Sequence, residues 1–113
     1  MRITATPGAR WPNKVAALAF LACAATFAQA QDARALHVKA LAATCANCHG
    51  TEGRAIANSE VPGLAGMPAS YMVAQMQAFK KGERPATVMH QLAKGFSDEQ
   101  IQQMAAYFAA QKK

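Results

Sequence analysis

The sequence contains few cysteines, few acidic residues and no long apolar run. Three of its 113 residues are cysteine, and six Asp and Glu stand against twelve Lys and Arg. No uninterrupted apolar stretch approaches the ~18 residues of a membrane-spanning helix, which argues against an integral membrane protein. Apolar residues nevertheless make up 52% of the chain, which excludes a disordered protein. The length allows one domain.

Acidic residues are absent altogether from the first thirty positions. An apolar stretch over residues 15–25 is followed by the small-x-small sequence Ala28-Gln29-Ala30, and it is preceded by the basic residues Arg2, Arg10 and Lys14. These three parts are typical of a secretory signal peptide. We therefore predict a signal peptide over residues 1–30, cleavage after Ala30 and export to the periplasm. A buried N-terminal helix is the alternative.

Removal of residues 1–30 changes what the composition implies. The remaining domain, residues 31–113, has nine basic and six acidic residues, too few cations for the dense basic face of a nucleic-acid-binding protein. Only Cys45 and Cys48 remain, because Cys23 leaves with the signal unless it is a lipid-modified N-terminal cysteine. A disulfide framework is thereby excluded, although so small a domain usually needs a disulfide, a metal or a cofactor.

Apolar spacing and helix breakers predict a purely helical domain. The expected order is a helix over 32–44, a Gly- and Pro-rich loop over 50–68, a helix over 69–81 that ends at Gly82, a short segment over 85–94 that ends at Gly95, and a last helix that starts at Ser97. Ser97 and Gln100 fit a capping box. The apolar stripe of the last helix comprises Ile101, Met104, Ala105 and Phe108. Because most apolar side chains are Ala, these helices alone would build a thin core.

The two remaining cysteines lie in Cys45-Ala46-Asn47-Cys48-His49, the C-x-x-C-H pattern of covalent haem attachment. A chain of this composition would contain the pattern by chance only about 0.002 times. Two thiols at this spacing can form thioethers with the two vinyl groups of one haem, and the next imidazole can then bind the iron. A covalently bound haem c would also supply the apolar centre that the helices lack.

Three other kinds of site share part of this pattern. A thioredoxin-like redox pair would need a strand–helix setting, which the sequence does not predict. A zinc site would need a second Cys/His pair at ligand spacing, and His37 and His90 are too scattered for that. A disulfide between Cys45 and Cys48 would close too short a loop to stabilise the domain appreciably.

The ligand opposite His49 decides between an electron carrier and a haem that binds reactants, because iron held by His and Met has no open position. Met72, Met76 and Met104 follow the helical spacing of core residues, and His37 is expected at the surface. The spacing alone leaves Met89, Met67 and His90 as candidates. Met89 and His90 would lie about 100° apart on a helix, so both cannot face the iron.

The ordered set of motifs resembles the class I c-type cytochromes, over nearly all of residues 35–111. The similarity is greatest to the haem domains of bacterial diheme cytochromes c and of flavocytochrome c sulfide dehydrogenases. The matching residues are Ala43-Thr44-Cys45-Ala46-Asn47-Cys48-His49-Gly50, Val61-Pro62-Gly63-Leu64-Ala65-Gly66, Tyr71, Gln75, Phe79, Gly82, Arg84, Met89, Leu92-Ala93-Lys94-Gly95-Phe96-Ser97-Asp98-Glu99-Gln100-Ile101 and Ala105-Ala106-Tyr107-Phe108.

The resemblance implies an all-α fold of about four helices around one haem c, with the first and last helices crossing near Ala40 and Phe108. It implies roles for eight residues: covalent attachment by Cys45 and Cys48, iron ligation by His49 and Met89, a carbonyl of Pro62 that accepts the His49 Nδ1–H, packing of Leu64 on the haem, and contacts of Tyr71 and Arg84 with its propionates. Lys80-Lys81-Gly82-Glu83-Arg84 is either a basic docking rim or a solvated helix end.

By the same resemblance, the chain is a periplasmic carrier that passes one electron between redox proteins and is not itself an enzyme. Its partners would be a flavoprotein, another dehydrogenase subunit or a terminal oxidase. The diheme relatives carry two C-x-x-C-H motifs and this chain carries one. It is therefore either a free single-haem carrier or the haem subunit of a dehydrogenase. A haem enzyme or gas sensor is the alternative from another class, and it would require a weak or absent Met89–iron bond.

Overall fold

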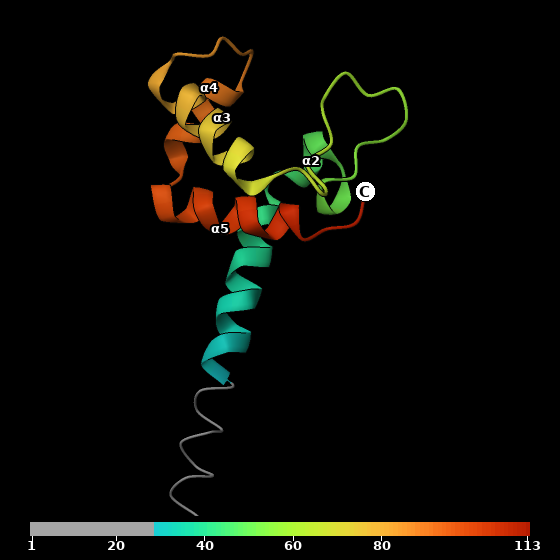
Figure 1. Cartoon of the computed structure of the whole chain (residues 1–113), viewed down its shortest axis with the longest axis vertical. Coiled ribbons are helices and arrows are strands. Elements are labelled where there is room, and N and C mark those ends of the chain that lie inside the picture. Colours follow the sequence, from blue (N-terminus) through green and yellow to red (C-terminus); the bar gives the residue numbers. More distant parts are fainter. Residues whose placement is uncertain (1–28) are drawn as a thin grey trace, which may run out of the picture. The chain divides into compact units, whose positions relative to one another are not determined.

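The computed structural model describes residues 29–113, in which helices are joined by loops (Figure 1). Residues 29–43 are helical, and the further elements are α2 (Ala46–His49), η1 (Thr51–Gly53), α3 (Ala69–Lys81), α4 (Met89–Leu92), η2 (Ala93–Gly95) and α5 (Asp98–Ala109). No strand occurs within this range, and the all-α prediction is confirmed. None of the helices described is long and apolar enough to cross a bilayer. Cys23 and most of the predicted signal peptide lie outside the described residues.

The α3 helix has the bounds that its sequence predicts. It ends at Gly82, whose left-handed conformation (φ 76°) lets its N–H reach the carbonyls of Ala78 and Phe79. Glycine adopts this conformation without steric cost, which is why it commonly terminates helices. Lys80 and Lys81 occupy the last turn, where positive charge is favourable because the helix dipole is negative there.

The start of α5 is set by the predicted capping box. The Ser97 hydroxyl accepts a hydrogen bond from the Gln100 backbone N–H at 3.1 Å, and the Ser97 N–H donates to Gln100 Oε1 at 2.9 Å. Asp98 and Glu99 add negative charge in the first turn, where the dipole favours it. Local residues therefore suffice to start this helix at the predicted place.

The buried core lies where α3 and α5 pack on the end of the first helix. It consists of Ala42, Met72, Ile101, Met104, Ala105 and Phe108, so Met72 and Met104 are core residues as predicted. The crossing point predicted for the first helix is wrong by two positions, because Ala42 is buried whereas Ala40 is exposed. A shift of two positions turns a helix by about 200°, so Ala40 faces the opposite side.

The short segment over 85–94, expected to hold one or two turns, contains α4 and η2 between Met89 and Gly95. Pro85 and the β-branched Thr87 and Val88 disfavour a helical turn before Met89. The α2 turn was not predicted at all, since four residues are too few to show a period.

Candidate haem-binding site

The C-x-x-C-H motif is folded into a single helical turn. The N–H groups of Cys48 and His49 both donate to the Cys45 carbonyl, at 3.3 Å and 3.0 Å. Residues at positions i, i+3 and i+4 of such a turn lie on one face, so the two thiols and the imidazole share a side of α2. Both cysteines are free thiols. The turn therefore presents two thiols and one imidazole together.

The two thiols have different surroundings. Cys45 is partly buried against the core cluster, whereas Cys48 is exposed. Burial raises the pKa of the Cys45 thiol, and the Thr44 hydroxyl, 3.9 Å from its sulfur, opposes part of that rise. The structure thus anchors one thiol in the protein interior and leaves the other at the surface.

The His49 ring is oriented by the loop that follows η1. Its Nδ1 lies 2.7 Å from the Pro62 carbonyl oxygen. Because a carbonyl can only accept, Nδ1 carries the proton, and Nε2 is the nitrogen left with a lone pair for a metal. The hydrogen bond that the resemblance implies between these two groups is therefore present, while iron ligation by His49 stays a prediction.

Gly53 holds that loop in place, a role that the sequence did not reveal. Its carbonyl accepts hydrogen bonds from the N–H groups of Leu64 (2.7 Å) and Ala65 (3.0 Å), just after Pro62. Gly53 is buried at φ 78°, and a Cβ there would lie 2.8 Å from Phe108 Cδ1. Only glycine meets both requirements. The spacing of glycines in a loop gives no hint of which one makes such a contact.

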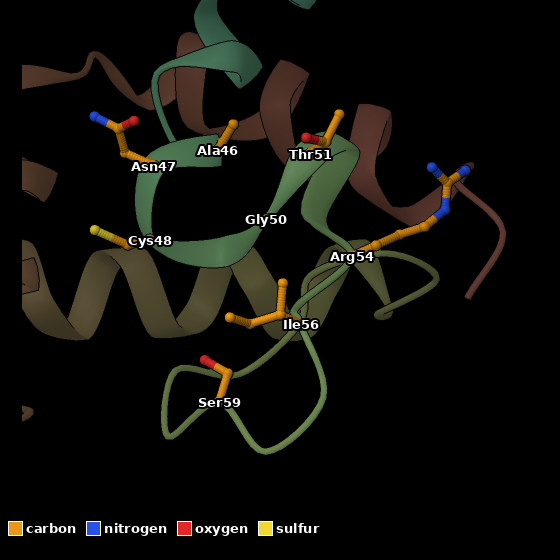
Figure 2. A pocket seen from close by; sticks show the side chains of 8 residues that line it. All are labelled: Ala46, Asn47, Cys48, Gly50, Thr51, Arg54, Ile56 and Ser59. Carbon is orange, nitrogen blue, oxygen red and sulfur yellow. The ribbon is translucent and has the colours of Figure 1, made fainter.

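A cavity of about 380 Å³ lies beside Cys48 (Figure 2), lined by Ala46, Asn47, Cys48, Gly50, Thr51, Arg54, Ile56 and Ser59. Ile56 is 79% exposed there, more than any other large apolar residue within residues 29–113. Arg54 extends away from Cys48 and Ile56, and its guanidinium bonds Glu52 (2.7 Å) and the Lys112 carbonyl (3.1 Å). An uncovered apolar side chain beside an exposed thiol suits a large apolar group attached at Cys48.

Met89 differs from the other methionines of the described chain. Met72 and Met104 belong to the buried core, and Met67 and Met76 pack against it. Met89 opens α4 and is only partly buried, outside that cluster. The other thioethers already fill apolar space, so Met89 is the methionine whose sulfur has no packing role in the core.

His90 was the second candidate in this segment. Its Nδ1 is buried and has no hydrogen-bond partner among the described residues. The predicted surface residue His37 is exposed, as expected. No group of three or more His, Cys, Asp or Glu side chains gathers as a metal site within residues 29–113.

The remaining predicted residues are Leu64, Tyr71 and Arg84, which differ in their burial and contacts. Leu64 is half-buried and packs against the core, and Tyr71 is 49% exposed on α3. Arg84 bonds the Gln75 side chain and lies over the Phe79 ring at 4.7 Å. These contacts hold the Arg84 guanidinium against α3, and its predicted contact with a propionate stays a prediction, as does that of Tyr71.

The residues present fit haem c. Two free thiols, an imidazole with Nε2 available, a methionine outside the core and an uncovered isoleucine are the donors and the apolar surface that this group requires.

Comparison with known proteins decides the family. The family model described as cytochrome c matches residues 35–112. The chain belongs to the cytochrome c family. This family implies a covalently bound haem c, and the resemblance to class I c-type cytochromes is confirmed.

Relatives of this cytochrome come from several bacteria. It is 39% identical to cytochrome c-554(548) of Halomonas halodenitrificans, over 61% of this chain and 86% of that protein. It is 40% identical to the cytochrome subunit of sulfide dehydrogenase of Chlorobaculum tepidum, over 60% of each chain. It is 33% identical to the thiosulfate dehydrogenase electron acceptor of Stutzerimonas stutzeri, over 74% of this chain and 40% of that protein. The cytochrome thus spans less than two thirds of the last two relatives, and the names of all three are those of electron-transfer proteins.

Proposed function

We propose that this cytochrome is a single-haem electron carrier whose iron is held by His49 and Met89. The observation that carries the proposal is that Met89 lies outside the core cluster. The other described methionines belong to this cluster or pack against it. When bound, the haem supplies a one-electron change between ferric and ferrous iron. His49 and Met89 would hold the iron between them, and a haem held in this way would transfer electrons without binding a substrate.

The chain's own residues prepare this site. Cys45 and Cys48 attach the haem, and Leu64 and Ile56 give it apolar surface. The Pro62 carbonyl accepts a short hydrogen bond from the His49 Nδ1–H. This bond holds the ring in one orientation and increases the electron density at Nε2. A fixed imidazole changes little between the two oxidation states, which favours rapid electron transfer.

We further propose that the carrier works in the periplasm, after cleavage of residues 1–30 behind Ala30. Its partners are redox proteins. The relatives named as a sulfide dehydrogenase subunit and a thiosulfate dehydrogenase electron acceptor favour a dehydrogenase of a sulfur compound as electron donor. Whether the chain is bound to that enzyme or diffuses freely can be tested by purification from its own host. A bound subunit would co-purify with a flavoprotein or other dehydrogenase chain, and a free carrier would not.

The decisive experiment is Met89→Ala in the haem-loaded protein. We expect the wild type to show the far-red sulfur-to-iron absorption band and to bind carbon monoxide poorly when reduced. Met89→Ala should lose the band and bind carbon monoxide readily. His90→Gln and Met67→Leu are matched controls that should keep the band.

Two other outcomes would overturn the assignment. A wild type that lacks the band and binds carbon monoxide would be a gas-binding or catalytic haem protein. A band lost in Met67→Leu, but kept in Met89→Ala, would move the ligand to Met67. Intact mass of the exported protein tests the rest: one haem on a chain that begins at Gln31 is expected.

A further inference from the structure

Lys80 joins the end of α3 to the chain that enters α5. Its Nζ donates to the Asp98 carboxylate (Oδ1) and to the Phe96 carbonyl oxygen, each at 2.8 Å. Asp98 Oδ1 also accepts a hydrogen bond from Gln77 Nε2 at 3.0 Å. The Lys80 side chain is only 29% exposed, whereas the neighbouring Lys81 is exposed. Lys80 is thus engaged inside the domain, which removes it from the predicted basic docking rim.

The contacts of Lys80 close a loop that contains Met89. Residues 81–95, which we term the methionine arm, leave α3 at Lys81 and return to the core at Phe96. Met89 lies near the middle of the arm, at the start of α4. The two ends of the arm therefore bracket Met89 in the sequence. Figure 1 shows α4 next to α3.

The methionine arm packs on α3 through α4 and η2, but it has few fully buried residues. Val88 and Leu92, on either side of Met89, are each 51% exposed, and Ala93 is the one fully buried residue of the arm. A segment with so few fully buried side chains opens at lower free-energy cost than the core does. The contacts at its two ends therefore contribute to its position.

The two ends are fixed by different groups. The departing end is held by backbone hydrogen bonds from Glu83 and Arg84 to the Ala78 carbonyl. Among the described residues, one hydrogen bond joins α3 to residues 90–96: Lys80 Nζ donates to the Phe96 carbonyl oxygen. Lys80 is therefore the polar link that secures the returning end.

We propose that Lys80 is a positioning residue that closes the methionine arm and so keeps Met89 on the haem iron. The inference rests on the proposed role of Met89 as iron ligand. Lys80 does not touch the iron; it acts by limiting how often the arm opens. The sulfur–iron bond is then supported by a clasp of one lysine, one carboxylate and one backbone carbonyl.

The test compares Lys80→Met with Lys81→Met in the ferric, haem-loaded protein. Both variants remove one positive charge from the same helical turn, and only the first removes the clasp. Imidazole, which competes with Met89 for the iron, is titrated while the sulfur-to-iron band is followed. We expect the apparent imidazole affinity to rise about threefold to tenfold in Lys80→Met, because the arm opens more often. Lys81→Met should stay within about 1.5-fold of the wild type, and Lys80→Arg should restore most of the wild-type value.

A second pair of variants keeps the test decisive if Lys80→Met does not fold. Asp98→Asn weakens the clasp, while Glu99→Gln removes a neighbouring charge from the same first turn of α5. Asp98→Asn should raise the imidazole affinity by less than Lys80→Met does, because the Phe96 carbonyl still binds Lys80. Glu99→Gln should not change it.

The outcomes separate this inference from the proposed function. Equal imidazole affinities for Lys80→Met and Lys81→Met, in proteins that keep the sulfur-to-iron band, would overturn the role of Lys80 alone. A wild type without that band would instead overturn the assignment of Met89. A lower melting temperature in Lys80→Met with unchanged imidazole affinity would also count against the inference, because it would show a purely structural role.

Discussion

The α3–α5 helix pair and the ligand-bearing segments differ sharply in how much apolar surface they bury. Ile101, Met104 and Phe108 of α5 are 1%, 4% and 3% exposed. In the segments that carry the predicted ligands, Ile56 and Leu92 are 79% and 51% exposed. The helix pair thus has a core of its own, and the segments that carry the predicted ligands do not.

This difference indicates two sources of stability in one small domain. The helix pair is stabilised by burial of its side chains, at roughly 25 cal/mol for each Å² of apolar surface removed from water. The segments that carry the predicted ligands are held by backbone hydrogen bonds around Gly53 and by the clasp at Lys80. Their exposed apolar residues are not buried by other side chains. A covalently bound haem would provide an apolar surface for them. The following changes test the contrast, in order of decreasing expected effect.

Loss of both attachment sites should affect the segments that carry the predicted ligands most. Cys45→Ala/Cys48→Ala, produced in a host that matures c-type cytochromes, should contain no covalent haem and lose its cooperative thermal unfolding, because the remaining core is small. Acid–acetone extraction measures the first effect and circular dichroism the second. Cys23→Ala is the control, since it should leave the exported protein unchanged. A double variant that still unfolds cooperatively would show that the α3–α5 core suffices.

Truncation of the core should affect stability without changing the haem spectrum. Phe108→Ala should cost about 3–5 kcal/mol of the free energy of unfolding, measured by denaturant titration, because it leaves a cavity between α5 and the first helix. Leu36→Ala is the matched control: Leu36 is 69% exposed, and its truncation should cost less than about 0.5 kcal/mol. Equal effects would contradict the placement of the core.

A methyl group at Gly53 should disturb both regions at once. Gly53→Ala combines strain at a positive φ with a contact on Phe108, so we expect a loss of about 2–4 kcal/mol and an altered NMR signal of the His49 Nδ1 proton. Gly82→Ala isolates the backbone strain, because φ is 76° there and nothing lies within 4 Å of the added Cβ. It should cost about 1 kcal/mol and leave the His49 signal unchanged.

The smallest effect is expected from the pH dependence of the Lys80 clasp. Hydrogen bonds from Gln77 and Lys80, with the charges of Lys80 and Lys81, lower the pKa of Asp98 below its ordinary value of 3.8. A carboxylate with a depressed pKa stabilises the fold at pH values above 3.8, and this contribution is lost as the pH falls through the folded-state pKa. The stability difference between wild type and Asp98→Asn should therefore be constant near neutrality and shrink below pH 3.8. A difference that grows on acidification would contradict this account.

Local signals in the sequence predicted a large part of the fold. The bounds of α3, its end at Gly82 and the capping box at Ser97 all follow from residues close together in the chain, and all three were confirmed. The attachment motif is equally local, because five consecutive residues define it. The residue at which the first helix meets the core was predicted near Ala40 and is Ala42, since an Ala-rich helix has little contrast between its faces.

The candidate site was predicted only in part, because some of its features depend on contacts between residues far apart in the sequence. Cys45, Cys48 and His49 follow from the motif, but the choice among Met89, Met67 and His90 could not be made from spacing. Packing distinguishes the two methionines, because Met67 lies against the core and Met89 does not, and the choice of iron ligand stays a prediction. The role of Gly53 depends on Phe108, which is far away along the chain.

The sequence by itself determined the helices, their caps and the C-x-x-C-H motif, because each depends on residues within one or two turns of one another. Only the tertiary structure decided which methionine is left outside the core, where the Pro62 carbonyl meets His49, and which lysine bonds the Phe96 carbonyl. These are contacts between distant residues, and they exist only after α3, α5 and the loop around Gly53 have packed together.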